Sequence, residues 1–498
     1  MRVLLELRPA LDGHAGIPQE TRLLFRELRG LPGVEMQGLI QSSNRVLSRG
    51  LPGGAAAREA LSSHQRIDRL SRVVVSLQAS SKPSRTERLA AALQLTVKPA
   101  MMLGRALLGR PVPLGVFDPG LFRDFVWRAF FSKTLSHEDF NLLTSMPFRV
   151  AQVPWSAAHA GALLTGKLGH HLYARLDTHD FDILIAETPY PGRVSRGTQM
   201  VVRYHDAIPL LMPHTISDRA YHRASHFQAL RRNVKDGAWF ACVSETTRQD
   251  LLSVFPEAAK RSVTIHNVIS ESYFPEERDA TAIPEIIKIR RQAPLKGVPA
   301  LGPRVQGPVE YLLMVSTIEP RKNHLTLLAA WEQLRATTRP GLELVLVGAL
   351  GWEHKAILRK MRPWLAGGGL HMLEEVPSSE LRLLYRHALA TVCPSFGEGF
   401  DFSGVEAMRC GGIVVASDIP VHREVFGDAA EYCTPYSQDL MASAIATVID
   451  PAAGSRRVAL RDEGQRMARR YSMDAVLPQW QQLLETLGPS GRIRTGAR

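Results

Sequence analysis

The sequence predicts an α/β fold of two domains, each with a doubly wound parallel sheet covered by helices. Two observations carry this prediction. Short apolar runs alternate with helix-length segments in two stretches of the chain, residues 1–270 and residues 309–470. Between them, residues 271–308 break the alternation with six prolines and mixed charge, which is typical of a linker. The length of 498 residues allows two or three domains of roughly 100–200 residues each.

The first domain is expected to begin with a strand, a loop, a helix and a second strand. An apolar run at residues 3–7 precedes Gly13 and Gly16, and another apolar run follows at residues 34–40. The opening run is too short, and too soon broken by charge, to be a signal peptide. Later strands are predicted where apolar runs end in polar or turn residues, at residues 181–186, 200–204, 239–243 and 263–267.

Residues 41–150 do not continue this alternation and are expected to form a helical insert in the first domain. Residues 89–108 are apolar but broken by Lys98, Pro99 and Arg105. Amphipathic helices explain this segment and the aromatic cluster after it, and they have two placements: capping the first sheet, which we favour, or contacting a membrane. The aromatic cluster consists of Phe117, Phe122, Phe125, Trp127, Phe130 and Phe131.

The second domain is expected to hold six parallel strands with helices between them. Helices are predicted at residues 323–334, around Lys355 and at residues 379–387. A terminal helix is expected at residues 471–487, and residues 488–498 resemble a disordered basic tail. The six strands are predicted at residues 311–315, 342–347, 371–374, 389–393, 413–416 and 431–434.

The composition limits the class of protein and the kind of partner. A formal charge of +13 favours an anionic partner, which could be nucleic acid, anionic lipid or a phosphorylated substrate, and no nucleic-acid-binding motif is present. The four cysteines lack Cys-x-x-Cys spacing, so zinc and redox motifs are unsupported and reduced, cytosolic thiols are expected. No apolar run approaches the ~18 residues that cross a bilayer.

The stretch at residues 394–424 is the most informative part of the chain. A glycine-containing turn between an apolar run and a helix presents backbone N–H groups at a helix N-terminus, which favours a phosphate. Glu398 in the turn and Glu406 in the helix could each accept hydrogen bonds from sugar hydroxyls. A structural alternative remains for Glu406, because Ser403 and Glu406 have the spacing of a capping box.

Two further segments are expected beside this turn. Arg321 and Lys322 follow a predicted strand and precede a helix, so their charges could converge on phosphates; a solvated basic turn is the alternative. His205 and Asp206 follow the strand at residues 200–204, and ligands bind at the carboxyl ends of parallel strands. A lone histidine is more often structural, so the role of His205 stays open at this point.

The motifs resemble the GT-B glycosyltransferases of family 4, which includes retaining mannosyl- and glucosyltransferases. Ser-Phe-Gly-Glu-Gly-Phe at 395–400 and Glu-Ala-Met-x-Cys-Gly-Gly at 406–412 are similar to the donor-site signature, and Glu-Pro-Arg-Lys-Asn-His at 319–324 is similar to the pyrophosphate motif. Two departures stand out: Asp401 occupies a position that is often glycine, and Thr317 one that is often arginine. The resemblance implies two Rossmann-like domains with a cleft between them.

The resemblance also implies roles for individual residues. Glu398, Arg321, Lys322 and His205 are the implied catalytic residues. Gly16, where a plain tight turn is equally compatible, and Asp206 are implied on the acceptor side. No metal is expected, since cationic side chains and helix dipoles replace it in such enzymes. The implied donor-binding residues are Ser316, Thr317, Gly399, Phe400, Asp401, Phe402, Ser403 and Glu406.

The implied reaction is transfer of a hexose, with retention, from a nucleotide-diphosphate sugar to a hydroxyl of a polysaccharide or lipid-linked glycan such as lipopolysaccharide. GDP-mannose is the favoured donor because Tyr-His-Asp-Ala-Ile-Pro at 204–209 resembles mannosyltransferases. No cofactor is expected, and the protein is expected in the cytoplasm, with peripheral binding to an anionic membrane as a second possibility. The alternatives are a sugar-nucleotide epimerase or phosphorylase of the same fold, and a non-catalytic scaffold.

Overall fold

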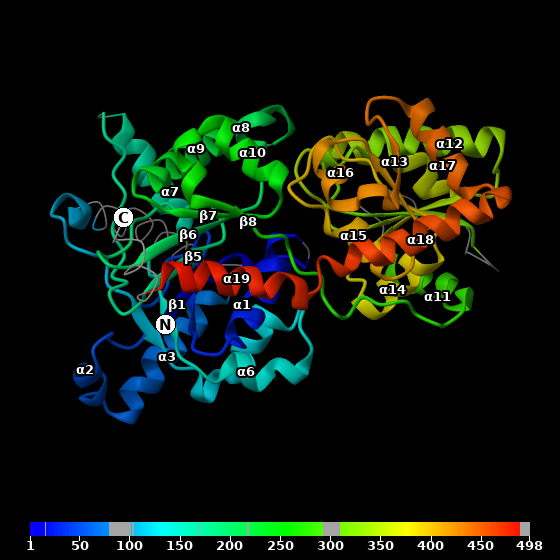
Figure 1. Ribbon diagram of the computed structural model, residues 1–498. Helices are drawn as coiled ribbons and strands as arrows, with labels where there is room; N and C mark the ends of the chain where they lie inside the picture. The colour runs from blue at the N-terminus through cyan, green and yellow to red at the C-terminus, as the bar shows by residue number, and fades with distance from the viewer. Residues whose placement is uncertain are drawn as a thin grey trace.

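The computed structural model describes residues 1–14, 16–78, 101, 104–167, 169–216, 219–291 and 309–488. The chain forms two lobes, each with its own sheet, and the last helix runs back across the first lobe (Figure 1). This confirms the predicted α/β class with two doubly wound domains. The apolar segment at residues 89–108 and the predicted tail at residues 488–498 both fall mostly outside the described residues.

The first sheet has eight strands in the order β3-β4-β2-β1-β5-β6-β7-β8. All neighbours pair in parallel except β3 and β4, which are antiparallel. The apolar runs form the buried strands because both faces of the sheet are covered. The bounds are β1 (Arg2–Glu6), β2 (Glu35–Ile40), β3 (Gly115–Phe117), β4 (Phe148–Val150), β5 (Ile183–Ala186), β6 (Gln199–Tyr204), β7 (Trp239–Cys242) and β8 (Ser262–Thr264).

Helices cover this sheet on both faces. Helix α1 starts directly after Gly16, which has a φ of 70° and lies at the helix N-cap. The bounds are α1 (Ile17–Arg29), α2 (Ala55–Glu59), α3 (Ser63–Leu77), α5 (Arg123–Val126) with a π-helical turn at Trp127–Phe131, α6 (Phe140–Thr144), α7 (Trp155–Gly166), α8 (Ile208–Leu211), α9 (Arg219–Lys235) and α10 (Glu245–Val254).

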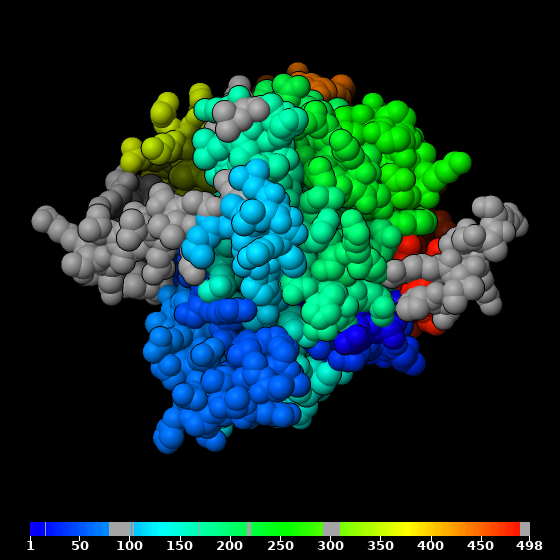
Figure 2. All heavy atoms as spheres, turned by 90° about the vertical axis from the view of Figure 1, so that its left-hand side faces the viewer, coloured from blue at the N-terminus to red at the C-terminus, as the bar shows by residue number. Residues whose placement is uncertain are grey.

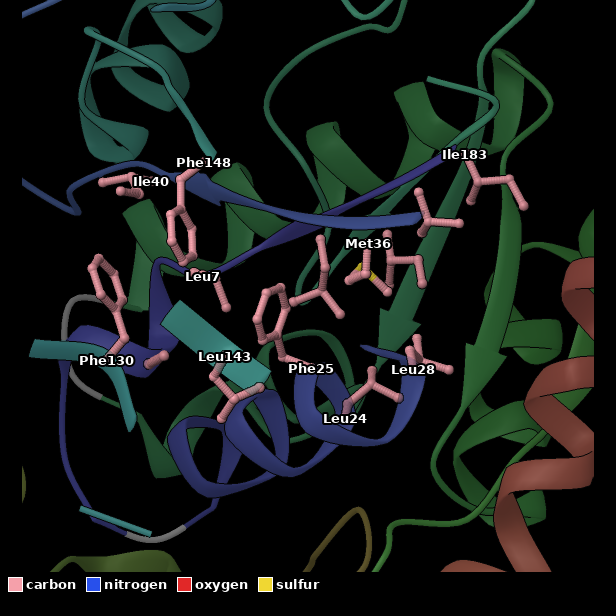
Figure 3. Packing of buried hydrophobic residues seen from close by; sticks show 14 of the residues in the cluster. Leu7, Leu24, Phe25, Leu28, Met36, Ile40, Phe130, Leu143, Phe148 and Ile183 are labelled. Atoms are coloured by element: carbon pink, nitrogen blue, oxygen red, sulfur yellow. The ribbon is translucent and has the colours of Figure 1, made fainter. Parts of the chain in front are cut away.

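The insert differs from the purely helical one that the sequence predicted. It adds β3 and β4 to the edge of the sheet, so Phe117 lies in a strand rather than in a helix. Phe130 and Phe131 are fully buried, and the Phe130 ring stacks on Phe148 with centroids 6.4 Å apart. Figure 3 shows Phe130 and Leu143 of the insert pointing into the same core as Phe25. The aromatic cluster is thus mainly core, which confirms the capping placement for these residues.

The second sheet has six parallel strands in the order β11-β10-β9-β12-β13-β14, as predicted. Its strands are β9 (Tyr311–Val315), β10 (Glu343–Val347), β11 (Leu370–Leu373), β12 (Ala390–Cys393), β13 (Val414–Ser417) and β14 (Ala430–Cys433). Its helices are α12 (His324–Thr337), α13 (His354–Gly367), α14 (Ser378–His387), α15 (Phe402–Arg409), α16 (Pro420–Phe426), α17 (Gln438–Ile449) and α18 (Gly454–Arg469).

Two helices connect the domains or lie close to their boundary, and only the second of them was predicted. Helix α11 (Ile283–Arg290) lies inside the predicted linker, and its Ile283, Ile286 and Ile287 join the core of the second domain. The flanking prolines hid this short apolar pattern. Helix α19 (Met473–Leu487) returns to the first domain, where Trp480 is buried in the core beside α1 (Figure 1). Among the described residues, no helix has both the length and the apolarity needed to cross a membrane.

Candidate active site at the domain interface

The candidate site lies where loops after strands of both sheets meet. The loop after β12 contains Glu398, and the loop after β9 contains Arg321 and Lys322. From the other domain, the loop after β6 brings His205 and Asp206 against the Glu398 loop. These strands end at the carboxyl edges of their sheets, which is the edge where open α/β sheets bind ligands. The structure thus brings together the two sequence segments that chain order keeps apart.

Arg321, Lys322 and Glu398 form one buried ionic network. The Arg321 guanidinium donates to Glu398 Oε2 at 2.6 Å and to Glu319 Oε1 at 2.9 Å, and it also reaches the Gly397 carbonyl at 2.8 Å. Lys322 Nζ donates to Glu398 Oε1 at 2.6 Å. Both oxygens of Glu398 therefore contact a cation. The alternative of a solvated basic turn does not hold, because the two cations are largely buried.

This network fixes the charge states at the site. Burial by itself raises the pKa of Glu398, but the positive charges of Arg321 and Lys322 outweigh it and lower that pKa. Burial likewise opposes the charge of Arg321, and the carboxylates of Glu398 and Glu319 outweigh it and raise its pKa. Glu398 is thus an anion held between the Arg321 and Lys322 side chains. Such fixed charges can stabilise a negatively charged leaving group without reorganisation.

Asp401 takes the conformation that glycine would otherwise supply. Its φ is 71°, in the left-handed region, and it is the N-cap of α15. Its carboxylate accepts from the Ser403 N–H at 3.1 Å and lies 3.2 Å from His422 Nε2. Short acidic side chains tolerate this backbone region by such local hydrogen bonds. The capping-box alternative for Glu406 is wrong, because Asp401, not Ser403, caps the helix.

Glu406 is buried at the contact between the two domains. Its carboxylate accepts from Gln19 Nε2 of α1 at 2.9 Å and from the Tyr385 hydroxyl of α14 at 3.0 Å. Burial raises the pKa of Glu406 to about 7, although these two hydrogen bonds act in the opposite direction. Both carboxylate oxygens are therefore paired with protein donors, one from each domain.

The Glu398 loop packs tightly on the first domain. A Cβ placed on Gly399 would lie 1.7 Å from the His205 carbonyl oxygen, so only glycine fits here. The Ser244 hydroxyl donates to the Gly399 carbonyl at 2.7 Å, which fixes the loop from the other side. Gly399 therefore allows the loop that contains Glu398 to contact the loop that contains His205.

His205 lies beside two buried carboxyl groups that the sequence analysis did not single out. Its Nε2 is 3.5 Å from Glu187 Oε2 and 4.0 Å from Glu20 Oε2. Burial lowers the pKa of His205 to about 4 although the Glu20 and Asp206 carboxyl groups act in the opposite direction, so the imidazole is neutral at pH 7. Burial raises the pKa of both Glu20 and Glu187, while Arg203 donates to Glu20 at 2.8 Å.

These three side chains could hold a small cation. Glu20, Glu187 and His205 each place one ligand atom within 4.8 Å of the others. The absence of a metal, which the family resemblance implies, stays a prediction. Glu187 could have been found from the sequence, because it directly follows the buried strand β5 as His205 follows β6. Glu20 could not have been found in this way, because it lies inside an amphipathic helix among other charged residues.

The remaining predicted residues lie around this network. Thr317 donates to Glu319 at 3.1 Å, and the Ser316 hydroxyl lies 3.2 Å from His324 Nε2. The Phe400 ring is buried against Tyr471, with centroids 5.0 Å apart, so only its backbone can face a ligand. Phe402 packs on Phe400. The carboxylate of Asp206 accepts from the N–H of Ile208, the first residue of α8, at 3.0 Å.

A second interdomain contact was not predicted. Glu424 of α16 accepts hydrogen bonds from the N–H groups of Glu245 and Thr246 at 2.6 and 2.8 Å, at the N-terminus of α10. His266 Nε2 lies 3.1 Å from the same carboxylate. Burial would raise the pKa of Glu424, but these hydrogen bonds outweigh it and lower the pKa to about 2.

Replacing Glu424 with glutamine should loosen the contact between the domains. The amide has one acceptor oxygen instead of two and no charge toward the helix N-terminus, which costs about 1–3 kcal/mol of interface stability. Because the folded pKa lies below the usual 4.5, the wild-type contribution is present above pH 4.5 and is lost as the pH falls through about 2. Small-angle scattering should show a larger radius of gyration for the variant at pH 7. An unchanged profile would contradict this role.

Both domains of the chain are similar to known glycosyltransferases. Residues 304–467 match the family described as Glycosyl transferases group 1, and residues 118–273 match Glycosyltransferase Family 4. O-antigen chain mannosyltransferase B of Escherichia coli is 29% identical over 256 residues, which are 51% of this chain and 61% of that protein. O-antigen chain mannosyltransferase RfbU of Salmonella typhimurium is 23% identical over 247 residues, 50% of this chain and 60% of that protein.

The chain thus matches somewhat less than two thirds of the length of these curated relatives. Among solved structures, sucrose-phosphate synthase from Thermosynechococcus elongatus aligns over 98% of both chains with a TM-score of 0.60 and 14% identity. That likeness shows a shared two-domain fold. Together the two family matches cover more than half of the chain and fall in its two domains, so the chain belongs to the GT-B glycosyltransferases of family 4.

Proposed function

We propose that this chain is a retaining glycosyltransferase that transfers mannose from GDP-mannose to a hydroxyl of a polysaccharide or lipid-linked glycan. One observation carries the proposal: Arg321, Lys322 and Glu398 form a buried network at the carboxyl edge of the second sheet, directly against His205 and Asp206 of the first. Similarity to two O-antigen mannosyltransferases supports mannose as the sugar.

The proposed chemistry follows from these charges. The donor diphosphate would lie at Arg321 and Lys322, where two cations can stabilise the leaving phosphate. Glu398 would accept hydrogen bonds from the sugar and Glu406 from the ribose. The bond between the anomeric carbon and the phosphate oxygen breaks, and the acceptor oxygen forms its bond to that carbon on the same face. The departing phosphate oxygen takes the proton of the acceptor hydroxyl. This course retains the configuration and needs no carboxylate nucleophile.

Neutral His205 fits the acceptor side of this arrangement. An imidazole with a pKa near 4 carries no charge at pH 7, so it can exchange hydrogen bonds with a sugar hydroxyl without repelling the positive charge that develops on the sugar ring. Asp206, whose pKa is raised by burial although Arg321 acts against this, lies at the same loop. We assign these two residues and Gly16 to the sugar and acceptor side.

A scan of sugar nucleotides by thermal shift tests the function. GDP-mannose and GDP should each raise the melting temperature, and GDP-mannose with a mannose-containing acceptor should give GDP and an α-linked product. Stabilisation by UDP-sugars alone would overturn the donor. Conversion of the sugar nucleotide to an epimer without an acceptor would identify an epimerase, and binding without any turnover would favour a scaffold. No stabilisation by any sugar nucleotide would overturn the proposal as a whole.

We also propose that the protein works in the cytoplasm at the inner face of the membrane, held there reversibly. The insert exposes Leu107, Leu108 and Leu121 at 71%, 72% and 80%, and its surface forms part of the outer face of the first domain (Figure 2). The formal charge of +13 adds attraction to anionic lipid, at about 1 kcal/mol for each basic residue close to the surface.

This location gives a simple prediction. The protein should sediment with anionic phosphatidylglycerol vesicles at low salt and be released at about 0.5 M salt, where charges are screened beyond a few ångströms. Replacing Leu107 and Leu108 with serine should weaken the sedimentation, whereas the exposed Val458→Ser on α18 serves as a control. Equal recovery with anionic and neutral vesicles would contradict the role of anionic lipid, and no recovery with either would contradict membrane binding.

A further inference from the structure

A cavity of about 580 Å³ opens in the first domain, beside the ends of β1 and β2. Leu11 on its wall follows β1, and Arg45 follows β2. The opposite wall belongs to the insert, with Leu77 at the end of α3 and Phe125 and Arg128 in and after α5. The cavity therefore lies at the ligand-binding edge of the sheet, and the insert at residues 41–150 lines most of it.

Buried Arg22 holds the two halves of this cavity together. Its guanidinium donates to the carbonyls of Ala10, Asp12 and Gly13 in the loop after β1, at 2.7, 2.8 and 2.9 Å. It also donates to the Phe130 carbonyl in the insert at 2.8 Å. A single fully buried side chain thus connects the sheet edge to the insert, so the cavity is a built feature and not a gap between independent segments.

Three cations line the cavity: Arg45, Arg128 and Lys133. Their hydrogen bonds go to backbone carbonyls, from Arg45 to Leu77 at 2.6 Å, from Arg128 to Asp124 at 3.4 Å and from Lys133 to Leu11 at 3.4 Å. Within the described part of the chain, none of the three forms an ion pair, although Asp12 also lines the cavity. The balance of these side chains is +2, which favours an anion with more than one charge.

The same cavity has an apolar side. Leu11, Leu77, Phe125 and Ala129 line it beside the three cations. Burial against this surface stabilises an alkyl or isoprenoid chain but not a free phosphate, which has no apolar surface to bury. The cavity therefore matches a ligand with an anionic group next to an apolar chain.

Lys133 of the cavity wall shares an electrostatic neighbour, His14, with the second domain. Lys133 acts electrostatically on His14, and so does Glu375, which follows β11 in the second domain. His14 lies between the cavity wall and the α1 N-terminus, where Gln19 contacts Glu406. Along the chain, the loop that contains Leu11, Asp12 and His14 thus connects the cavity wall to the helix that contacts Glu406.

We infer that this cavity binds the anchor of the acceptor, a phosphate or diphosphate ester of an apolar chain, with Arg45, Arg128 and Lys133 on the phosphate and the apolar wall on the chain. This inference rests on the proposed function, since it names the class of acceptor for the same reaction. It gives the insert a specific role, namely selection of lipid-linked acceptors.

Calorimetry with farnesyl diphosphate tests this site in the full-length protein saturated with GDP, so that the donor side is filled. Farnesyl diphosphate should bind with a stoichiometry of one, and farnesol and inorganic diphosphate should each bind at least about tenfold more weakly. The double variant Arg128→Ala/Lys133→Ala should lose about tenfold or more in affinity. Arg72→Ala, an exposed arginine of the same insert, should lose nothing.

The outcomes separate the two proposals. Equal binding of farnesyl diphosphate and farnesol, or an unchanged affinity in the double variant, would overturn the anionic subsite. Equal binding of inorganic diphosphate would overturn the lipid part and indicate a free-phosphate site. GDP affinity serves as the folding control for the variants and reports on the proposed function alone: a wild-type protein that binds no nucleoside diphosphate would refute that function, whatever farnesyl diphosphate does.

Discussion

Replacing Glu398 with alanine is expected to lower turnover by about ten- to a hundredfold without weakening the binding of GDP. Glu398 lies between Arg321 and Lys322, and we assign it to the transferred sugar, which GDP lacks. A hydrogen bond to a charged group contributes about 1.5–3 kcal/mol, and here it matters most while the anomeric bond breaks. Removing an anion from beside two cations cannot weaken their attraction to phosphate, so GDP affinity should stay equal or rise.

Glu406→Ala should show the opposite pattern, with GDP affinity reduced roughly ten- to a hundredfold, because the ribose is present in donor and product alike. Calorimetry with GDP on both variants, beside initial rates with GDP-mannose, separates the two roles. Gln19→Ala is the matched control, since it removes the interdomain partner of Glu406 but no ribose contact. If Gln19→Ala lowers the GDP affinity as much as Glu406→Ala does, the role of Glu406 is only to join the domains. Equal losses of GDP affinity in Glu398→Ala and Glu406→Ala would refute the division of roles.

Replacing Arg321 with alanine should lower the free energy of unfolding by about 3–5 kcal/mol and weaken GDP binding at least tenfold. The guanidinium is 13% exposed, and its partners Glu319 and Glu398 are 1% and 7% exposed. Removing it leaves two buried carboxylates with Lys322 as the remaining cation of this network, which is the situation in which broken ion pairs cost most.

Urea unfolding followed by circular dichroism measures the stability change, with Arg423→Ala as the control. Arg423 pairs with Asp418, but both side chains are about half exposed, so its loss should cost no more than about 1 kcal/mol. Arg321→Lys should recover part of the stability, because it restores the charge but not the contacts with both carboxylates. Equal losses for Arg321→Ala and Arg423→Ala would contradict the buried network.

Much of the fold was predictable because its signals are local. The bounds of all six strands in the second sheet lie within one residue of the predicted apolar runs, since a strand covered on both faces must be apolar along its length. The glycine-containing loop and the two basic residues of its neighbour were also recognisable, because phosphate binding needs those residue types at the ends of strands. The departure at Asp401 could be seen as well, but not the hydrogen bonds with Ser403 and His422 that support its left-handed backbone.

Other features depended on residues far apart in the chain. Strands β3 and β4 are three residues each, too short for a periodic signal, and they exist because β4 pairs with β2 across more than a hundred residues. Helix α11 was taken for linker because its prolines dominate the local pattern, while its isoleucines only acquire meaning beside the core of the second domain.

The sequence by itself determined the two α/β domains, the family and the charged residues of the donor side. Strand periodicity and loop composition are properties of short segments, so they can be recognised without the tertiary structure. Only the tertiary structure decided how those charges are paired. Glu398 meets Arg321 and Lys322, Gly399 touches His205, and Glu20 and Glu187 surround that histidine because separate strands end at a common edge. Burial then sets the pKa of each group, and burial is a property of the packed chain that no short segment possesses.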